Sequence, residues 1–178
     1  MKKLYKPMKA QLLEIGGLFP SMTAMRLPFD GGVSDSISNA YEFTLGKKDA
    51  KRAKTLILLG DEHAKCIRGI DAWIKVEMQI GVMIEFVTYH IGVDDLSTSS
   101  SMHNELVKLK NDELAEEKQA GLSTKMYTRI FKSNYQALRR IYKQRRSHRH
   151  PDWQYFCDFI EALPYFKEFI YPEFVESM

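Results

Sequence analysis

The chain has little of what builds secreted or membrane proteins. Its 178 residues include only two cysteines, Cys66 and Cys157, too few for a disulfide framework or a thiolate zinc site. No apolar run reaches the roughly 18 residues of a membrane span, and no apolar signal-peptide core follows the basic start MKKLYKPMKAQ. We therefore expect an intracellular, cytoplasmic protein that does not enter a membrane.

Several motifs of common enzymes are also missing. The sequence contains no GxxxxGK[ST], GxGxxG, GxSxG or CxxC, which argues against P-loop nucleoside triphosphatases, Rossmann dehydrogenases, hydrolases and thioredoxin-like proteins. An apolar content of 44% is nevertheless enough for a core. We predict a single domain over residues 1–178, in which residues 163–178 form a possible packing arm.

Acidic residues are absent between Thr128 and Pro151, although the net charge of the chain is only +3. Eight cations lie in this interval: Arg129, Lys132, Arg139, Arg140, Lys143, Arg145, Arg146 and Arg149. A cluster of one sign destabilises the fold unless an anion, or acidic groups elsewhere in the chain, neutralise it. We predict an exposed cationic helix whose arginines are gathered around a small anionic ligand.

Hydrophobic periodicity in the first half predicts strands and helices in alternation. The predicted elements are a strand over Lys9–Ile15, a helical turn over Pro20–Arg26 that ends before Pro28, a mobile loop over Asp30–Ser38, and a helix over Lys47–Leu59. Two β-rich runs, Ala72–Glu77 and Gly81–His90, flank a turn or bulge at Met78–Ile80. A helix is the alternative interpretation of this region.

The second half is predicted to be mainly helical. The predicted helices cover Met102–Gln119, Arg129–Arg146 and Pro151–Leu163, and the polar segment Leu96–Ser101 has the composition of a helix N-cap. Pro151 and Asp152 suit the first turn of the last helix. Strands early and helices late are typical of an α+β fold.

The order of residues in the last third resembles the flavin-dependent thymidylate synthases, the ThyX family. That family has L-P-x-x-x-Y-T-R-F-x-x-x-x-N, a helix that ends in Leu-Arg, a short turn and A-Q-W-E-I. The matching residues here are Leu122-Ser123, Tyr127-Thr128-Arg129, Asn134, Leu138, Gln144-Arg145 and Asp152-Trp153. Residues 16–29 are similar to the opening segment of the family. The chain is also similar to short, phage-type relatives through Gln144-Arg145, His148, Trp153 and Leu163-Pro164-Tyr165.

This resemblance implies a small antiparallel sheet packed with a C-terminal helical layer, homo-oligomers such as tetramers, and FAD as cofactor. In the family, reduced flavin passes a carbon unit from a methylene-folate to dUMP without a protein nucleophile, so no catalytic side chain is assigned. The residues implied for the pyrimidine nucleotide are Arg145, Ser97, Thr98, Ser100, His148 and His150. The residues implied for the cofactor are Tyr89, His90, Arg129 and Asn134.

The departures from the family pattern leave other functions open. The Arg-His-Arg flavin signature of the family corresponds to Thr88-Tyr89-His90, and its arginine before Leu-Pro corresponds to Gln119. Each lost charge-assisted contact is worth on the order of 1.5–3 kcal/mol. A catalytically inactive relative that binds a host protein or a nucleotide signal is therefore the alternative. A nucleic-acid binder that uses the Arg129–Arg149 strip is a third, less favoured hypothesis.

The implied site residues also have purely structural interpretations. Ser97–Ser101 can bind phosphate at a helix N-terminus or can serve only as a helix cap. Asn134 also suits a cap, and Arg145 also suits a solvated helix face. The H-x-H spacing of His148 and His150 is a weak metal signal without further ligands.

Overall fold

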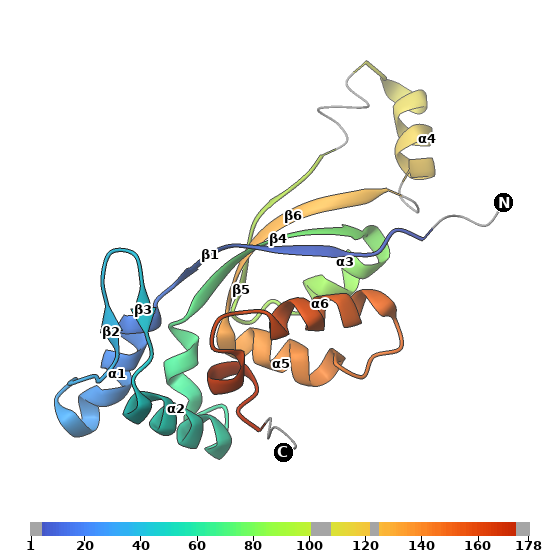
Figure 1. The fold of residues 1–178 in the computed structure, drawn as a ribbon. Coiled ribbons are helices and arrows are strands. Elements are labelled where there is room, and N and C mark those ends of the chain that lie inside the picture. The colour runs from blue at the N-terminus through green and yellow to red at the C-terminus, as the bar shows by residue number, and fades with distance from the viewer. Residues whose placement is uncertain (1–4, 101–107, 122–124, 174–178) are drawn as a thin grey trace.

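The computed structural model describes residues 5–100, 108–121 and 125–173. Its centre is a four-stranded antiparallel sheet in the order β1-β4-β6-β5 (Figure 1). The strands are β1 (Lys9–Gly16), β4 (Asp71–Gln79), β6 (Met126–Asn134) and β5 (Val93–Thr98). The two-residue strands β2 (Ile37–Ser38) and β3 (Phe43–Thr44) form a separate hairpin. The predicted α+β class and small antiparallel sheet are confirmed.

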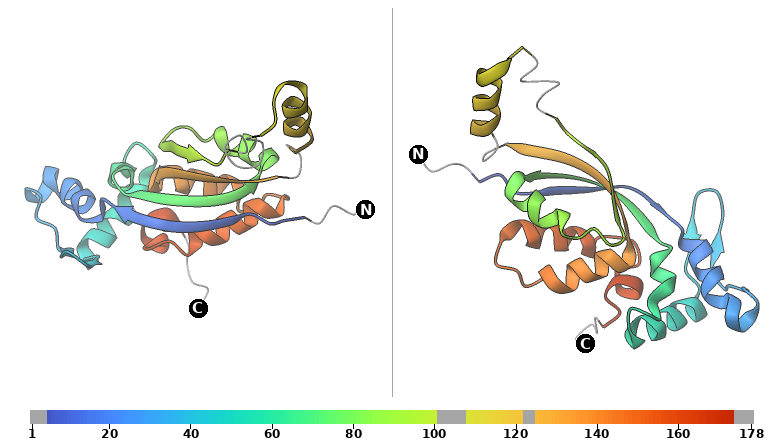
Figure 2. Two further views of the ribbon diagram at one scale, coloured as in Figure 1. Left: turned by 90° about the horizontal axis from the view of Figure 1, so that it is seen from above. Right: turned by 180° about the vertical axis from the view of Figure 1, so that it is seen from behind.

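One face of the sheet is buried beneath helices. Along β4, Ala72, Ile74, Val76 and Met78 are fully buried, whereas their neighbours in the strand are only half-buried. This alternation is what a strand with one covered face requires. Helices α5 (Tyr135–Arg145) and α6 (Pro151–Glu161) lie side by side against the sheet (Figures 1 and 2). The predicted C-terminal helical layer is therefore present.

Residues 80–87 form helix α3 (Ile80–Val87), so the predicted strand over Gly81–His90 is wrong and the helical alternative is correct. Val82, Met83 and Phe86 are buried on one side of α3, while Ile84 and Val87 are exposed. The β-branched residues favour a strand locally, but packing of one helical face overrides that preference. Met78 and Gln79 still belong to β4, so the predicted turn is also absent.

The predicted helix over Arg129–Arg146 is half strand and half helix. Arg129, Phe131 and Ser133 alternate into the core along β6, which pairs with both β4 and β5. Helix α5 begins only at Tyr135, and the Asn134 side chain caps it by accepting a hydrogen bond from the Ala137 N–H at 2.9 Å. The apolar residues of β6 and α5 happen to fit one helical period, which explains the error.

The N-terminal elements agree with prediction except at their ends. The helix α2 (Lys47–Leu59) has the predicted bounds. The helix α1 (Leu18–Asp30) continues through Pro28 and is followed by Gly31, whose φ of 62° provides the left-handed C-cap. The predicted end before Pro28 is therefore wrong. The helix ends at Asp30, because Gly31 directly after it takes the left-handed conformation that stops a helix. The predicted loop over Asp30–Ser38 is shortened at both ends by α1 and β2.

The segment after β5 and the C-terminus complete the chain. Leu96–Thr98 lie in β5, so they do not form the predicted N-cap. The helix α4 (Asn111–Gly121) starts later than predicted, since residues 108–110 are not helical; residues 101–107 lie outside the described residues. After α6, a short π-helical turn, η2 (Phe166–Ile170), packs on α5 through a Tyr142–Phe166 ring contact at 5.1 Å. The predicted packing arm, as far as Glu173, therefore lies against its own chain.

Candidate functional site

The turn between α5 and α6 faces the end of α3 and is held in a defined shape. Gln154 donates hydrogen bonds to the carbonyl oxygens of Arg145 at 3.3 Å and of His148 at 2.6 Å. The His148 N–H also donates to the Arg145 carbonyl at 2.9 Å. At the start of α6, His150 Nδ1 accepts from the Asp152 N–H at 3.3 Å, and Pro151 occupies the first turn. These contacts fix where the Arg145 side chain leaves the helix.

Arg145 is positioned by three side chains: Glu85 in α3, Tyr89 just after α3, and Trp153 in α6. Its Nε donates to the Tyr89 hydroxyl at 2.6 Å, and its Nη1 lies 3.3 Å from Glu85 Oε2. Its guanidinium carbon lies 4.3 Å from the centroid of the Trp153 ring. Trp153 Nε1 in turn donates to Glu85 Oε2 at 2.9 Å. The Arg145 side chain keeps 19% of its surface exposed, so it is oriented yet still reachable by a ligand.

A second arginine lies behind the same aromatic cluster. Phe86 stacks on Trp153 with ring centroids 5.5 Å apart and an interplanar angle of 9°. The Arg129 guanidinium carbon lies 6.0 Å from the Phe86 centroid, and its Nε donates to Asp95 Oδ1 at 2.9 Å. Arg129 Nη1 is buried and finds no hydrogen-bond partner within the described part of the chain. A buried unsatisfied donor costs about 1–3 kcal/mol, so this atom marks a place where an acceptor would stabilise the structure.

The other predicted nucleotide residues are scattered over this end of the fold. Ser97 and Thr98 are exposed on β5, where they pair with Ile130 and Arg129, and they do not lie at a helix N-terminus. Ser100 is half-buried beyond the end of that strand. The helix start predicted near Met102 falls outside the described residues. Ser97 and Thr98 therefore present their hydroxyl groups from a strand, and their role in phosphate binding stays a prediction.

The two histidines of the turn have different surroundings. His148 Nδ1 accepts from the His150 N–H at 3.1 Å, and the His148 ring meets Trp153 edge-on at 6.3 Å. His148 thus lies next to the Arg145 cluster. His150 caps α6, a structural role that accounts for its Nδ1. Within residues 5–100, 108–121 and 125–173, no group of three or more His, Cys, Asp or Glu side chains converges to hold a metal ion.

The predicted cofactor residues lie in different surroundings. Tyr89 follows α3, where the sequence predicts the end of a strand, and contacts Arg145; His90 is exposed with Nδ1 3.2 Å from the Thr88 carbonyl. Asn134 caps α5 and packs on the turn at Gly92, whose φ is 78°. A Cβ at Gly92 would lie 2.6 Å from Asn134 Nδ2, so the turn into β5 needs glycine. The cap interpretation of Asn134 is therefore confirmed.

Carboxylates from distant parts of the chain neutralise most of the cationic segment. The ion pairs are Arg129–Asp95, Lys132–Asp94 and Lys132–Asp71, Arg139–Glu173, Arg140–Asp61, Lys143–Glu173 and Arg145–Glu85. Arg146 stacks on the Tyr171 ring at 4.6 Å. The predicted exposed cationic helix is therefore wrong: Arg129 and Arg139 are buried, and the cations point to several different partners.

Comparison with known proteins rests on structure. No protein-family model and no curated protein matches the sequence. A crystal structure of thymidylate synthase X (ThyX) from Helicobacter pylori with FAD and dUMP matches with a TM-score of 0.69 and 12% identity, over 93% of this chain and 98% of that chain. A second H. pylori ThyX structure, also complexed with FAD and dUMP, matches with a TM-score of 0.66 and 13% identity over the same shares. The chain has the ThyX fold.

Sequence reasoning missed two members of this site in the ThyX fold. Glu85 is the only charged residue between Glu77 and His90, and an isolated acid in an apolar helix is a signal that it has a partner. Asp95 has no comparable signal, because it lies in a polar stretch. Trp153 is fully buried, and it also supports the Arg145 guanidinium. Cation–π contacts of this kind leave no mark in local sequence.

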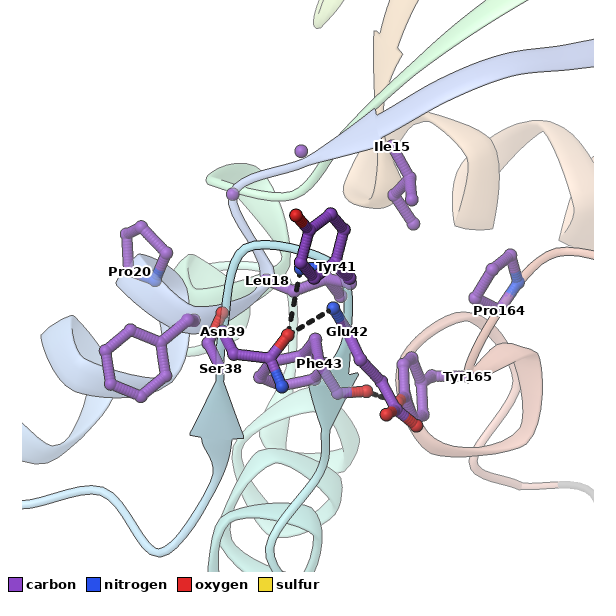
Figure 3. A pocket seen from close by; sticks show the side chains of 13 residues that line it. Ile15, Leu18, Pro20, Ser38, Asn39, Tyr41, Glu42, Phe43, Pro164 and Tyr165 are labelled. Atoms are coloured by element: carbon purple, nitrogen blue, oxygen red, sulfur yellow. Dashed lines mark hydrogen bonds between the residues drawn. The ribbon is translucent and has the colours of Figure 1, made fainter.

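A cavity of about 450 Å³ lies elsewhere in the ThyX fold, between the β1–α1 junction, the β2–β3 hairpin and Tyr165 (Figure 3). Two of its polar side chains are engaged within the fold: Asn39 Oδ1 accepts from the N–H groups of Tyr41 and Glu42, both at 2.9 Å, and the Tyr165 hydroxyl donates to the Phe43 carbonyl at 2.7 Å. None of the predicted site residues lines it. We therefore place the candidate site at Arg145, where paired charged groups lie on an aromatic support, and not at this cavity.

The two cysteines are poorly suited to act as nucleophiles. Burial raises the pKa of the Cys66 thiol to about 11 and that of Cys157 to about 12, so neither is a thiolate nucleophile near neutral pH. Among the described residues, none of the helices has both the length and the apolar character needed to cross a bilayer.

Proposed function

We propose that this protein binds a pyrimidine nucleotide such as dUMP at the Arg145 cluster. The observation that carries the proposal is a guanidinium held by Trp153 and Tyr89 beside the Glu85 carboxylate. Proteins of the same fold have been crystallised with dUMP and FAD. A cytoplasmic location stays a prediction.

The pairing with Glu85 favours the uracil ring over the phosphate as the group that meets Arg145. Arg145 Nη2 makes no hydrogen bond in the described part of the chain, so its N–H groups can donate to a ring carbonyl. Glu85, 45% exposed, can accept the adjacent ring N–H. A phosphate would instead meet a carboxylate of like charge beside the arginine. Ser97, Thr98, Ser100, His148 and His150 stay candidates for the phosphate.

FAD is the cofactor that the fold suggests, and Arg129 is the residue that fits it best. Its buried Nη1 needs an acceptor, and a ring carbonyl or a phosphate oxygen of a flavin dinucleotide supplies one. A bound flavin would supply the electrons for methyl transfer to dUMP. The residues that would hold it are Tyr89, His90, Arg129 and Asn134. Arg129 would donate to the acceptor, and Asn134 retains its amide donors because the cap uses only Oδ1.

A second function is favoured by a different observation. Thr88-Tyr89-His90 supplies no guanidinium, and Tyr89 is already engaged by Arg145. A protein with this arrangement can keep nucleotide binding while losing flavin-dependent methyl transfer. In that case the ThyX fold serves as a binding module for a nucleotide signal or a host protein. We expect a homo-oligomer such as a tetramer under either function.

The test is to purify the protein and record its visible spectrum, the mass of any co-purified molecule, and its heats of binding for dUMP and FAD. Flavin absorbance together with dUMP binding supports the methyltransferase. Saturable dUMP binding by a colourless protein that does not take up FAD supports the binding module. Absence of binding to both ligands would contradict the methyltransferase and the dUMP-binding module alike. Light scattering during the same purification gives the oligomeric state.

A further inference from the structure

One face of α2 carries a stripe of cations that the Arg145 site does not use. The residues of this stripe recur at spacings of three and four, which places them on one side of a helix: Lys48, Lys51, Arg52, Thr55 and Leu56. A different side of α2 is buried through Asp49, Ala53 and Ile57. Like charges at these spacings repel each other, so the stripe destabilises α2 unless an anion neutralises it.

These five residues and Arg26 of α1 line a cavity of about 370 Å³, which we call the α1–α2 pocket. Its volume lies in the range of small-molecule sites. Among the described residues that line it, four are cations and none is an acid. Figure 1 shows α1 and α2 at one end of the sheet, with α3 and the α5–α6 turn at the other. The pocket is therefore separate from the Arg145 cluster.

Two carboxylates that contact α1 or α2, Asp49 and Asp35, already serve the fold. Asp49 is fully buried and accepts from Arg26 Nε at 2.6 Å and from the Ser36 hydroxyl at 2.6 Å. Asp35 accepts from the backbone N–H groups of Lys48 at 2.8 Å and of Asp49 at 2.9 Å, and so caps the start of α2. Arg26 is thereby held in place as one wall of the pocket. The charge of Arg26 is neutralised by Asp49, whereas neither carboxylate forms an ion pair with a cation of the stripe.

Three cations of the stripe lack any acidic partner. Lys48, Lys51 and Arg52 form no ion pair with any residue that the structure describes. Arg52 Nε is buried and, within the same residues, has no hydrogen-bond acceptor. The Arg52 guanidinium carbon lies 3.7 Å from the centroid of the Phe29 ring, so stacking fixes its orientation while its donors stay unused. A buried donor held in this way indicates a missing acceptor.

We propose that the α1–α2 pocket binds a small molecule that carries a diphosphate group. Three positive charges without an acidic partner in one pocket favour an anion with more than one negative charge. The planar guanidinium of Arg52 suits two phosphate oxygens, and the two lysines act as point charges beside it. Leu56 and the Thr55 methyl group give an apolar wall for the rest of the ligand. Inorganic pyrophosphate and a nucleoside diphosphate share this chemistry.

The test is calorimetry at low ionic strength with inorganic pyrophosphate and, separately, with UDP. Saturable binding of pyrophosphate, weakened roughly tenfold or more by Lys51→Gln and by Arg52→Gln, supports the proposal. The matched control is Lys54→Gln, which removes the same charge from an exposed position of α2 outside the pocket and should leave the affinity unchanged. UDP binding that is tighter than pyrophosphate binding, is kept in Arg145→Gln and is weakened in Arg52→Gln identifies a nucleoside diphosphate as the source. Equal or weaker binding of UDP in Arg145→Gln identifies pyrophosphate.

Several results would overturn the proposal. These are the absence of saturable binding of both ligands, an equal loss of affinity in Lys54→Gln, or displacement of pyrophosphate by duplex DNA, which would identify a nucleic-acid surface. If Arg52→Gln does not fold, the double variant Lys48→Gln/Lys51→Gln is compared with Lys47→Gln/Lys54→Gln. Arg145→Gln should leave pyrophosphate binding intact, so failure of the nucleotide site and failure of this pocket can be told apart.

Discussion

The guanidinium of Arg145 lies over the indole of Trp153, 4.3 Å from the ring centroid, and the Nε1 of that indole donates to the same carboxylate that pairs with the arginine. Glu85 therefore orients both residues at once. Such a triad places a donor and an acceptor side by side on an aromatic support. This is the arrangement that a uracil ring edge needs, because its carbonyl and N–H groups are adjacent.

Replacement of Glu85 tests whether its carboxylate accepts a hydrogen bond from the uracil ring. Glu85→Leu removes the acceptor and should weaken dUMP binding by roughly tenfold or more, equivalent to about 1.4 kcal/mol. Glu85→Gln keeps one acceptor and should lose less. Calorimetric titration with dUMP measures both changes. An unchanged affinity in Glu85→Leu would show that this carboxylate does not contact the base.

The buried pair between Arg139 and Glu173 should stabilise the attachment of the C-terminal arm. Arg139 donates through Nη1 and Nη2 to both carboxylate oxygens, at 2.9 and 2.6 Å, and also to the Ile170 carbonyl at 2.7 Å. Arg139→Gln leaves a carboxylate partly buried without its partner and should lower the free energy of unfolding by about 3 kcal/mol.

The matched control for this pair is Arg140→Gln on the same helix, which breaks an exposed ion pair with Asp61. It should cost less than about 1 kcal/mol. Urea denaturation of both variants gives the comparison. Equal losses in the two variants would show that the Arg139 pair contributes no more than a surface contact.

The stability contributed by Glu173 should be lost in acid. Burial alone would raise the pKa of this carboxyl, but hydrogen bonds from Arg139 and Lys143 outweigh it and lower the pKa from 4.5 to about 2. A lowered folded-state pKa means that the contribution is fully present above pH 4.5 and fades as the pH falls toward 2. The difference in unfolding free energy between the wild type and Glu173→Gln should therefore shrink over that window. A constant difference would contradict the lowered pKa.

The two thiols should be unreactive in the folded protein. Burial raises the pKa values of Cys66 and Cys157, so few thiolates form near neutral pH and the reagent has little access. A chromogenic disulfide reagent should modify both cysteines in urea and neither one rapidly in native buffer. Rapid native modification of Cys66 or Cys157 would show that the core around that residue opens readily.

Local sequence patterns predict a helix or strand correctly where its buried residues recur at the spacing typical of that element. The bounds of α2 and the start of α6 at Pro151 follow from apolar spacing and capping residues alone. The pattern fails at β6, where Phe131 continues the apolar stripe of α5 in a helical period even though the strand is held by β4 and β5. It also fails at α3, where β-branched residues pack one helical face. In both places contacts between distant segments decide the structure.

In the candidate site too, some residues could be predicted from the sequence and others could not. Arg145 could be predicted because the resemblance and the end of a cationic helix both point to it. Its partners could not, since Glu85 in α3 and Tyr89 just after α3 are far from Arg145 in sequence. The cationic segment was interpreted as a ligand site as a whole, but its charges are mostly neutralised by carboxylates that only the fold brings near. Net charge within a window does not reveal such pairs.

Titration of dUMP into Arg145→Gln and Arg149→Gln tests the account most directly. Both variants lose one positive charge from the same turn region, but Arg149 is exposed, whereas Arg145 is bound to Trp153, Tyr89 and Glu85. We predict that Arg145→Gln weakens dUMP binding by roughly tenfold or more while Arg149→Gln keeps the wild-type affinity. Equal affinities in the two variants, or the absence of dUMP binding to the wild type, would contradict the assignment of this site.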